Sequence, residues 1–479
     1  MKKILFVGAE AMPFAATGGL GDVLGSLPAA IAAADADVDI RVVMPMYAQI
    51  SDAWRAQMKQ EAVFNVPLAW RNQYCAIYSL VKDRVTYYFI DNEYYFKRDT
   101  LYGHWDDAER YAYFCRAVME MMRELDYYPD ILHAHDWQAA LSVVYLRTRF
   151  RYVQNYHQIR TVFTIHNIEY QGKYDFSILG DIFDLGYENY SLMNYNGCIN
   201  LMKAAIECAD RVSTVSPRYA EEILTADYAH DLHYCLANHT NKLCGILNGI
   251  DYDFYNPKTD PVIPQHYSSA SIHRKYANKT DLQQKIGLPE DPDVPLLAII
   301  SRLATHKGLD LITEIAYNLM KDQNAQLVIL GKGEKRYEEF FLWLQEQFPD
   351  RVRALIEYDR DLSKRIYAAC DIFLMPSRSE PCGLSQMIAS RYGAIPVTRE
   401  TGGLYDSIKG YWKNEEGELF GNGFTFANYS AQELLERTCA AIELYQNAKE
   451  RKALIRKIME TDFSWNVSAK RYLEMYRNI

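Results

Sequence analysis

The length, composition and charge of the chain exclude several classes of protein. At 479 residues it is too long for one ordinary core, so two domains of roughly 200 residues each are expected. With 49% hydrophobic and 24% charged residues, it has the balance of a soluble globular protein. The net charge of −10 argues against nucleic acid as the main partner, although one local basic pocket could still lie within an acidic whole.

The cysteines and the N-terminal segment indicate a cytoplasmic protein. Nine cysteines are scattered singly, with no CxxC pair and no Cys/His cluster, which fits reduced thiols. The apolar run at residues 4–7 is too short for a secretion signal, and Glu10 interrupts it, so we expect a first buried strand there. No stretch of about 18 apolar residues exists, so we expect no membrane contact.

Short β-branched runs recur along the chain, each followed by a loop and a helical pattern. They lie at residues 4–7, 40–44, 85–90, 131–133, 161–165 and 212–215, and then at 296–300, 327–330, 354–356, 372–375 and 395–397. Continuous apolar strands alternating with helices predict parallel sheets covered on both faces. The fold class is therefore α/β, with two doubly wound Rossmann-like domains. The irregular segment at 243–257 separates them, and the segment at 431–479 is expected to be helical.

Polar and glycine-rich segments follow the predicted strands. They occupy residues 17–22, 133–137, 166–167, 301–303, 331–333, 377–380 and 401–404. In open α/β sheets, ligands bind beyond the carboxyl ends of the strands. If these two edges face each other, they form a deep cleft.

Two glycine loops are candidate anion sites. Thr17-Gly18-Gly19 and Thr401-Gly402-Gly403 each lie between a strand and a helix, where bare N–H groups and a helix N-terminus can hold an anion. The first loop matches neither GxGxxG nor Walker A, and it can equally be a tight turn that needs glycine for backbone reasons. For the second, the structural alternative is a helix N-cap by Thr401.

Two cations and one carboxylate are the strongest candidates for chemistry in the second half. Arg302 and Lys307 follow a buried strand, where their charge suits a diphosphate leaving group; the alternative is a solvated loop. Glu380 precedes Gly383, which lets the chain approach a ligand closely, so this carboxylate can grip sugar hydroxyls or stabilise positive charge. Its alternative role is that of an acid at a helix N-terminus.

Metal binding is not favoured by the pattern. Strand alternation points His133 and His135 one way and leaves Asp136 on the other face, and no further cluster completes a ligand set. The D-x-D strings at 35–39, 251–253 and 291–293 are interpreted as surface and hinge acids. We therefore predict a metal-independent protein without a cofactor. Most of the 38 tyrosines are expected to pack in the core.

Ordered motifs along the whole chain resemble a known family. They are TGGLGDV at 17–23, DNEYYF at 91–96, HAHDW at 133–137, TIHN at 164–167, STVSP at 213–217, GILNGID at 245–251, SRL at 301–303, PSRSEPCGL at 376–384, TGGL at 401–404 and DFSW at 462–465. The chain is similar to bacterial glycogen synthases and plant starch synthases, the family-5 retaining glycosyltransferases of GT-B fold.

The resemblance implies roles for individual residues. Arg302 and Lys307 would bind and stabilise the departing diphosphate, Glu380 would hold the donor glucose, and His166 would sit against the anomeric centre. The remaining nucleotide-sugar contacts would come from Thr17, Gly18, Gly19, Asp22, Asp136, Asn248, Tyr358, Gly383, Leu384, Ser385, Thr401, Gly402 and Gly403. The acceptor glucan would lie mainly on the first domain, with Tyr94, Tyr95, Trp137 and Asn167 as its contacts.

The resemblance also implies domain limits and two departures from the family pattern. The first domain would span 1–244 and the second 245–457, with a last helix at about 458–479 crossing back onto the first. The family usually has a lysine before TGGL, where this chain has Ala16, so donor binding should be weakened. The segment at 228–234 replaces a glycine-rich stretch and should be less flexible.

The resemblance implies a synthase that transfers glucose from ADP-glucose to the non-reducing end of an α-1,4-glucan with retention. No second carboxylate stands out as a covalent nucleophile. Two alternatives remain: another GT-B transferase with a different donor, and a catalytically weak paralogue that binds glucan or regulates a working synthase. The pattern leaves the choice between ADP-glucose and UDP-glucose, the oligomeric state and the regulation open.

Overall fold

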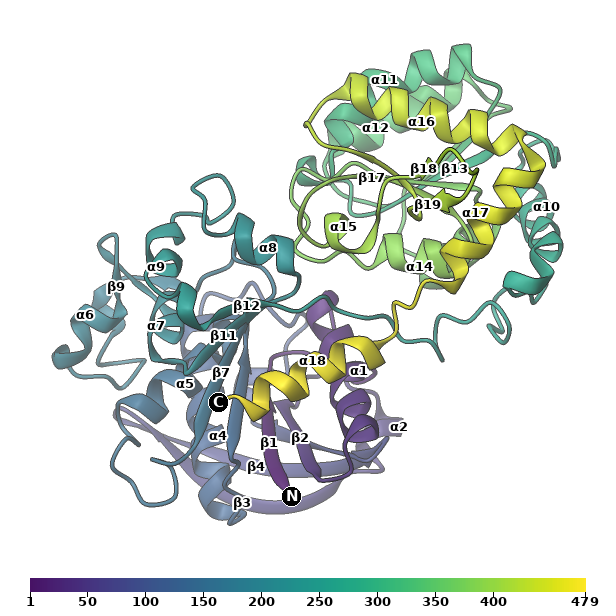
Figure 1. The fold of residues 1–479 in the computed structure, drawn as a ribbon. Helices are drawn as coiled ribbons and strands as arrows, with labels where there is room; N and C mark the ends of the chain where they lie inside the picture. The colour runs from purple at the N-terminus through teal and green to yellow at the C-terminus, as the bar shows by residue number, and fades with distance from the viewer. The chain divides into compact units, whose positions relative to one another are not determined.

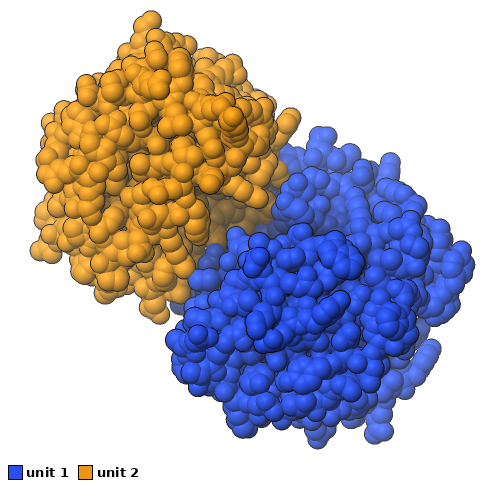
Figure 2. All heavy atoms as spheres, turned by 180° about the vertical axis from the view of Figure 1, so that it is seen from behind, with its two compact units in different colours: residues 1–249, 465–479 blue, residues 250–464 orange.

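The structure is a computed structural model that describes residues 1–479. The chain forms two compact units, each with its own sheet and helices (Figure 1, Figure 2). Unit 1 comprises Met1–Gly249 and Trp465–Ile479, and unit 2 comprises Ile250–Ser464.

A nine-stranded sheet forms the core of unit 1, with the strand order β12-β11-β7-β6-β1-β2-β5-β4-β3. Its strands are β1 (Lys2–Val7), β2 (Val38–Pro45), β3 (Lys59–Leu68), β4 (Arg71–Lys82), β5 (Val85–Asp91), β6 (Ile131–His135), β7 (Arg160–Ile165), β11 (Arg211–Thr214) and β12 (Leu243–Gly245). All six strands predicted for the first half are present. β1 lies between β2 and β6 and is fully buried from Ile4 to Val7, as its unbroken apolar run predicts.

The hairpin formed by β3 and β4 was not predicted. β3 pairs with β4 and β4 pairs with β5, in both cases antiparallel, and β3 forms the edge of the sheet. Its run contains Pro67, which argues against a strand because proline cannot donate to the ladder. At the edge of a sheet the missing N–H donor costs little stability, because one side of the strand has no partner. Pro67 is therefore tolerated in β3.

Helices cover the unit 1 sheet. They are α1 (Gly19–Ala34), α2 (Asp52–Arg55), α3 (Glu93–Phe96), α4 (Asp107–Glu124), α5 (Asp136–Arg147), α6 (Tyr190–Met193), α7 (Leu201–Cys208), α8 (Pro217–Glu222) and α9 (His233–Ala237). A small sheet of β8 (Lys173–Tyr174), β10 (Cys198–Asn200) and β9 (Asn194–Tyr195) lies apart from the main one.

Unit 2 is built on a six-stranded sheet in which every pair is parallel, with the order β15-β14-β13-β16-β17-β20. The strands are β13 (Leu296–Ile300), β14 (Gln326–Leu330), β15 (Val352–Leu355), β16 (Ile372–Met375), β17 (Ile395–Arg399) and β20 (Phe424–Phe426). The first five were predicted. β20 has only three residues, too few for a periodic signal.

The helices of unit 2 are α10 (Lys275–Ile286), α11 (Leu309–Asp322), α12 (Lys335–Gln347), α13 (Arg360–Ala369), α14 (Ser385–Arg391), α15 (Gly402–Ser407), α16 (Ala431–Gln446) and α17 (Ala448–Glu460). A two-stranded ribbon of β18 (Trp412–Lys413) and β19 (Leu419–Phe420) completes the unit. Lys279 and Asp371 form a buried ion pair of 2.8 Å. Asp371 also accepts from the Leu296 amide at 2.9 Å, so one carboxylate joins α10 to the start of β13.

The chain passes between the units slightly later than predicted. Residues 245–249 stay with unit 1, because β12 pairs with β11 and the Ile246 amide donates to the Thr214 carbonyl at 2.9 Å. The returning helix is α18 (Trp465–Arg477), which packs on α1 and pairs Arg477 with Asp35 at 2.9 Å. Its predicted start at about 458 belongs to α17, in unit 2.

All nine cysteines are free, as the scattered spacing predicted. None of the helices combines the length and the apolar character needed to cross a membrane.

Candidate functional site

Lys307 and Glu380 form an ion pair at the carboxyl edge of the unit 2 sheet. Lys307 ends a short 3-10 turn that follows β13, and Glu380 lies in the loop that follows β16. The Lys307 Nζ donates to Glu380 Oε2 at 2.7 Å, and the Ser377 hydroxyl donates to the same oxygen at 3.0 Å. Only 6% of Glu380 is exposed. Two residues that lie 73 positions apart are therefore held in direct contact.

Glycines allow the loops of this edge to approach so closely. Gly308 has φ +74°, and a Cβ there would lie 2.0 Å from the Pro376 carbonyl oxygen. Gly402 has φ +44°, and its Cβ would lie 1.9 Å from the Glu380 carbonyl oxygen. Side chains at either position would push apart the loops that carry Lys307 and Glu380.

The amides at this edge divide into two groups. The Gly403 amide donates to the Glu380 carbonyl at 3.1 Å and the Thr401 amide to the Arg399 carbonyl at 3.0 Å, so both serve the fold. Thr401 occupies the N-cap position of α15, but its side chain makes no capping bond. The amides of Leu384 and Ser385, at the start of α14, have no acceptor in the protein. These two lie beside Gly383 at φ +70° and remain free donors at this edge.

Arg302 and Tyr358 lie on the surface of the same edge. Arg302 follows β13, is exposed and forms no ion pair. Tyr358 follows β15, and 90% of it is exposed. The guanidinium and the ring are both accessible to a ligand.

In unit 1, the corresponding edge brings together His135, His166 and Asp136. His135 Nδ1 lies 2.9 Å from His166 Nε2. Asp136 starts α5 with φ +57°, and its Oδ1 accepts from the His166 amide at 2.7 Å. Loss of hydration raises the pKa of Asp136 to about 7 and lowers the pKa of His166 to about 3. The His166 ring is therefore neutral at physiological pH.

The contact between the two rings favours one tautomer. His135 is fully buried, and its Nε2 has no partner. A buried N–H donor without an acceptor is less well tolerated than an acceptor without a donor. The proton of His135 is therefore favoured on Nδ1, from which it donates to His166 Nε2 and leaves the N–H of His166 on Nδ1.

His133 has a structural role rather than a metal-binding one. Its ring lies 4.2 Å from that of His135, on the same face as predicted. Its Nδ1 bonds the hydroxyl of Tyr476 at 2.7 Å, and its Nε2 bonds that of Thr164 at 2.5 Å, so both ring nitrogens are occupied. No group of three or more His, Cys, Asp or Glu side chains is arranged to hold a metal ion.

The first glycine loop contains a partner that the sequence reasoning missed. Glu10 is 3% exposed and accepts from the Thr17 and Gly18 amides at 2.7 and 3.2 Å. Its other oxygen accepts from the hydroxyls of Thr17 at 2.8 Å and Tyr102 at 2.7 Å. Two amides predicted to hold a ligand anion are thus taken by an internal carboxylate. The sequence did contain a signal for this contact, because Glu10 is an acidic residue that closely follows the buried strand β1, at the ligand edge of the sheet.

The predicted acceptor contacts separate by exposure. Tyr94 is 61% exposed, whereas Tyr95 is completely buried and its hydroxyl donates to Glu109 at 2.5 Å. The prediction for Tyr95 is therefore corrected, because its ring packs in the core and presents no face to a sugar. Trp137 is half-buried, with Tyr111 edge-on at 5.3 Å. Asn167 is half-buried, and its side-chain oxygen accepts from the Glu169 amide at 3.0 Å.

Asn248 and Asp22 complete the predicted contacts of unit 1. Asn248 is 6% exposed, and its Oδ1 has no hydrogen-bond partner. Asp22 lies in the first turn of α1, beside the exposed Gly18 and Gly19.

Known protein families match both halves of the chain. Residues 3–238 match a family model described as the starch synthase catalytic domain, and residues 278–460 match one described as glycosyl transferases group 1. The glycogen synthase of Bacillus subtilis (strain 168) is 44% identical over 479 residues, covering 100% of this chain and 98% of that protein. The glycogen synthase of Exiguobacterium sibiricum is 46% identical over 483 residues, covering 100% and 99%.

The chain belongs to the glycogen and starch synthase family. Among solved structures, the catalytic domain of starch synthase IV from Arabidopsis thaliana, bound to ADP and acarbose, matches with a TM-score of 0.90 and 33% identity over 100% of this chain and 99% of that one. Sucrose-phosphate synthase from Thermosynechococcus elongatus shares the fold alone, with a TM-score of 0.61 at 18% identity. The predicted family, the two-domain α/β fold of GT-B type and the glycosyltransferase class are confirmed.

Two departures from the usual family pattern stand out in the structure. Ala16 precedes the first glycine loop, so only neutral donors surround the buried carboxylate of Glu10. In the segment at 228–234, His230 and Asp231 adopt φ of +44° and +78°, a region that favours glycine. The carbonyl of His230 accepts from the buried Gln171 side chain at 2.9 Å, which holds this loop in place.

Proposed function

We propose that this synthase transfers glucose from ADP-glucose to the non-reducing 4-hydroxyl of an α-1,4-glucan, with retention of configuration. The observation that carries the proposal is the Lys307–Glu380 pair beside the free amides of Leu384 and Ser385. A cation, a carboxylate and two unsatisfied N–H donors on one edge match the diphosphate and the hydroxyls of a nucleotide-sugar.

On the donor side, Lys307, Arg302 and the two free amides would hold the diphosphate. Their charge and dipoles would stabilise it as the bond to the anomeric carbon breaks. Glu380 would exchange its contact with Lys307 for hydroxyls of the donor glucose. Tyr358, with its exposed ring, would contact the nucleotide base.

On the glucan side, unit 1 would contribute the exposed Tyr94 and a neutral His166. Because the proton is favoured on Nδ1 of His166, this ring would present a hydrogen-bond donor rather than a charge to the glucose. Asp136 would keep His166 in place through the His166 amide.

Retention is best explained by attack on the same face of the sugar. Glu380 is engaged by Lys307 and Ser377, and the sequence pattern offers no second carboxylate as a paired nucleophile. The bond between the anomeric carbon and the phosphate oxygen would break as the bond to the acceptor O4 forms. The departing phosphate would take the acceptor proton. A trapped covalent glucosyl-enzyme would contradict this route.

The test is incorporation of labelled glucose into glycogen from ADP-glucose and UDP-glucose, side by side. We expect incorporation from ADP-glucose, unchanged by a metal chelator, and its loss in Lys307→Ala. Incorporation from UDP-glucose alone would show that UDP-glucose is the donor. Incorporation from neither nucleotide-sugar would overturn the proposal.

A second candidate is a weakly catalytic paralogue that binds glucan or regulates a working synthase. The observation that favours it is Ala16, which leaves the first glycine loop without the usual lysine. Glycogen binding without glucose transfer would support this candidate.

A further inference from the structure

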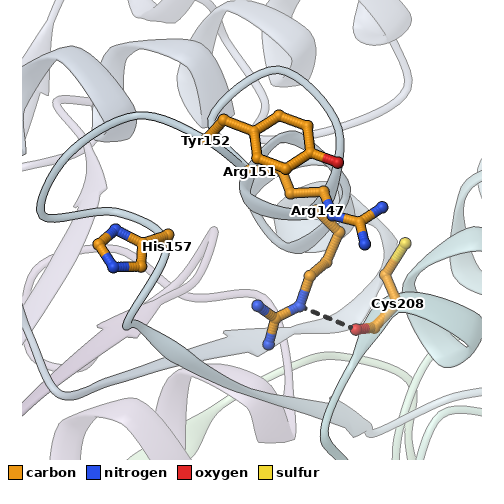
Figure 3. Close-up of a pocket in the computed structure, with 5 residues that line it drawn as sticks. All are labelled: Arg147, Arg151, Tyr152, His157 and Cys208. Atoms are coloured by element: carbon orange, nitrogen blue, oxygen red, sulfur yellow. Dashed lines mark hydrogen bonds between the residues drawn. The ribbon is translucent and has the colours of Figure 1, made fainter.

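A cavity lies in unit 1, away from the ligand edge of the sheet. Its volume is about 750 Å³, and it is lined by Arg147 at the end of α5, Arg151, Tyr152 and His157 in the next loop, and Cys208 at the end of α7 (Figure 3). The strands β7 and β11 begin, at Arg160 and Arg211, near this end of the unit. The cavity is therefore at the amino edge of the sheet, opposite His135 and His166.

Cations outnumber carboxylates around this cavity, in a chain of net charge −10. The carboxylates are Asp210 and Glu207, and Glu207 is paired with Lys203 at 2.9 Å. Arg147 and Arg160 share one carboxylate, that of Asp210. Lys242 lies close enough to influence Cys208, and its Nζ donates only to backbone carbonyls. Arg151 forms no ion pair at all.

The shape of the cavity adds an aromatic wall to this charge. The guanidinium carbon of Arg151 lies 5.3 Å from the centroid of the Tyr152 ring, and 87% of Tyr152 is exposed. Arg147 points to the Cys208 carbonyl at 3.4 Å (Figure 3), which holds its guanidinium against the cavity wall. Figure 3 shows His157 on the far side of the cavity from Cys208.

We propose that this cavity binds a small phosphate-bearing molecule. The unpaired guanidinium of Arg151 suits a phosphate group, which arginine binds through paired N–H donors. Arg147 adds positive charge, although its Nε and Nη2 already donate to Cys208, Thr161 and Asp210. The exposed ring of Tyr152 suits the hydroxylated body of a sugar phosphate. The ligand would be distinct from the donor, since no residue of the proposed donor site lies here.

α5 connects this cavity to the proposed catalytic edge. It begins at Asp136, which holds the His166 amide, and ends at Arg147, about 18 Å away for twelve residues. A ligand at the cavity therefore contacts the same rigid element that positions His166.

The experiment is a phosphate titration of the full chain followed by NMR of its histidine Cε1–H signals. His157 lines the cavity, and His306 adjoins Lys307, so the two signals report on the two regions separately. We expect a saturable shift of the His157 signal with inorganic phosphate. Arg151→Ala should raise the dissociation constant at His157 about ten-fold to a hundred-fold, and leave the His306 response unchanged.

The matched control is Arg149→Ala. Arg149 lies in the same loop, but its guanidinium faces Asp184 at 2.8 Å and does not line the cavity, so the His157 response should persist. The proposal is overturned if the His157 signal does not shift in a saturable way, or if Arg151→Ala leaves its dissociation constant unchanged.

Two sources of the phosphate can be separated with Tyr152→Ala. For a sugar phosphate, a hexose monophosphate should bind more tightly than inorganic phosphate, and Tyr152→Ala should remove that advantage. If the hexose monophosphate and inorganic phosphate bind with equal affinity, and Tyr152→Ala changes neither, the ligand of the cavity is free phosphate.

Discussion

The first glycine loop of unit 1 and the start of α14 in unit 2 both lie between a strand and a helix, but they differ in their hydrogen bonds. At residues 17–18, both amides donate to the buried carboxylate of Glu10. At residues 384–385, both amides are free, and Lys307 lies at the same edge. One loop is occupied by an internal anion, whereas the other is prepared for an external one.

The comparison shows what a glycine-rich loop does and does not indicate. Glycine lets the backbone approach an anion closely, but that anion can belong to the protein itself. A buried carboxylate at the first loop opposes a second negative charge nearby, and Ala16 supplies no cation to offset it. The diphosphate should therefore depend mainly on unit 2.

The largest effect should come from removing the cation of unit 2. Lys307→Ala should lower kcat by about 10²–10³-fold, because the charge that stabilises the leaving diphosphate is lost. Lys335→Ala, which removes an exposed lysine paired only with Glu339, serves as the control. Steady-state kinetics with ADP-glucose measure both, and a Lys307→Ala rate within a few-fold of the parent would contradict the comparison.

The next prediction tests whether Glu10 stabilises the fold at the first glycine loop or affects donor binding there. Glu10→Gln should lower the free energy of unfolding by about 1–3 kcal/mol, because the side-chain NH₂ faces donors and leaves one of them unsatisfied. The donor KM should change little. Urea unfolding and kinetics test this, with Glu93→Gln at an exposed site as the control. Unchanged stability with a lowered KM would instead assign the Thr17 and Gly18 amides to the donor, because the neutral side chain of Glu10→Gln would no longer oppose the negative charge of the diphosphate.

A smaller effect is expected from restoring the usual lysine. Ala16→Lys should lower the donor KM by up to about ten-fold without changing kcat, since a phosphate-directed cation is added. If the new lysine pairs with Glu10 instead, the gain should emerge only in a Glu10→Gln background. Ala53→Lys, on the exposed surface of α2, controls for added charge. Equal KM values in all these variants would show that Ala16 is neutral.

The last prediction concerns the pH dependence of stability and Asp136. Its pKa of about 7 lies above the unfolded value of about 3.9, so the folded protein holds this proton more tightly than the unfolded chain. Ionising Asp136 in the folded protein lowers the free energy of unfolding. This loss is absent below about pH 4, grows up to about pH 7 and is then constant. The unfolding free energy of Asp136→Asn minus that of the parent should therefore rise over this window. A difference that is flat with pH would contradict it.

Much of the architecture was predictable because it depends on local patterns. Apolar runs such as 296–300 are buried on both faces and become central parallel strands. Arg302, Lys307 and Glu380 follow such strands, and the carboxyl ends of parallel strands share one edge. The hairpin containing Pro67 was missed because the pattern does not reveal which strand lies at an edge. Tyr95 was misassigned because a tyrosine suits both a sugar site and a core.

The sequence by itself determined the central parallel strands of the two sheets and the residues at their carboxyl edges, because periodicity and burial are local properties. Only the tertiary structure decided which polar groups are already satisfied. Tyr102 donates a hydrogen bond to Glu10, and His133 bonds the hydroxyl of Tyr476. These partners lie far apart in the sequence, so no local pattern predicts the contacts. The cavity at Arg151 likewise forms only when the loop after α5 packs beside the end of α7. Hydrogen-bond partners depend on this long-range packing, and they decide which amides and cations remain available to a ligand.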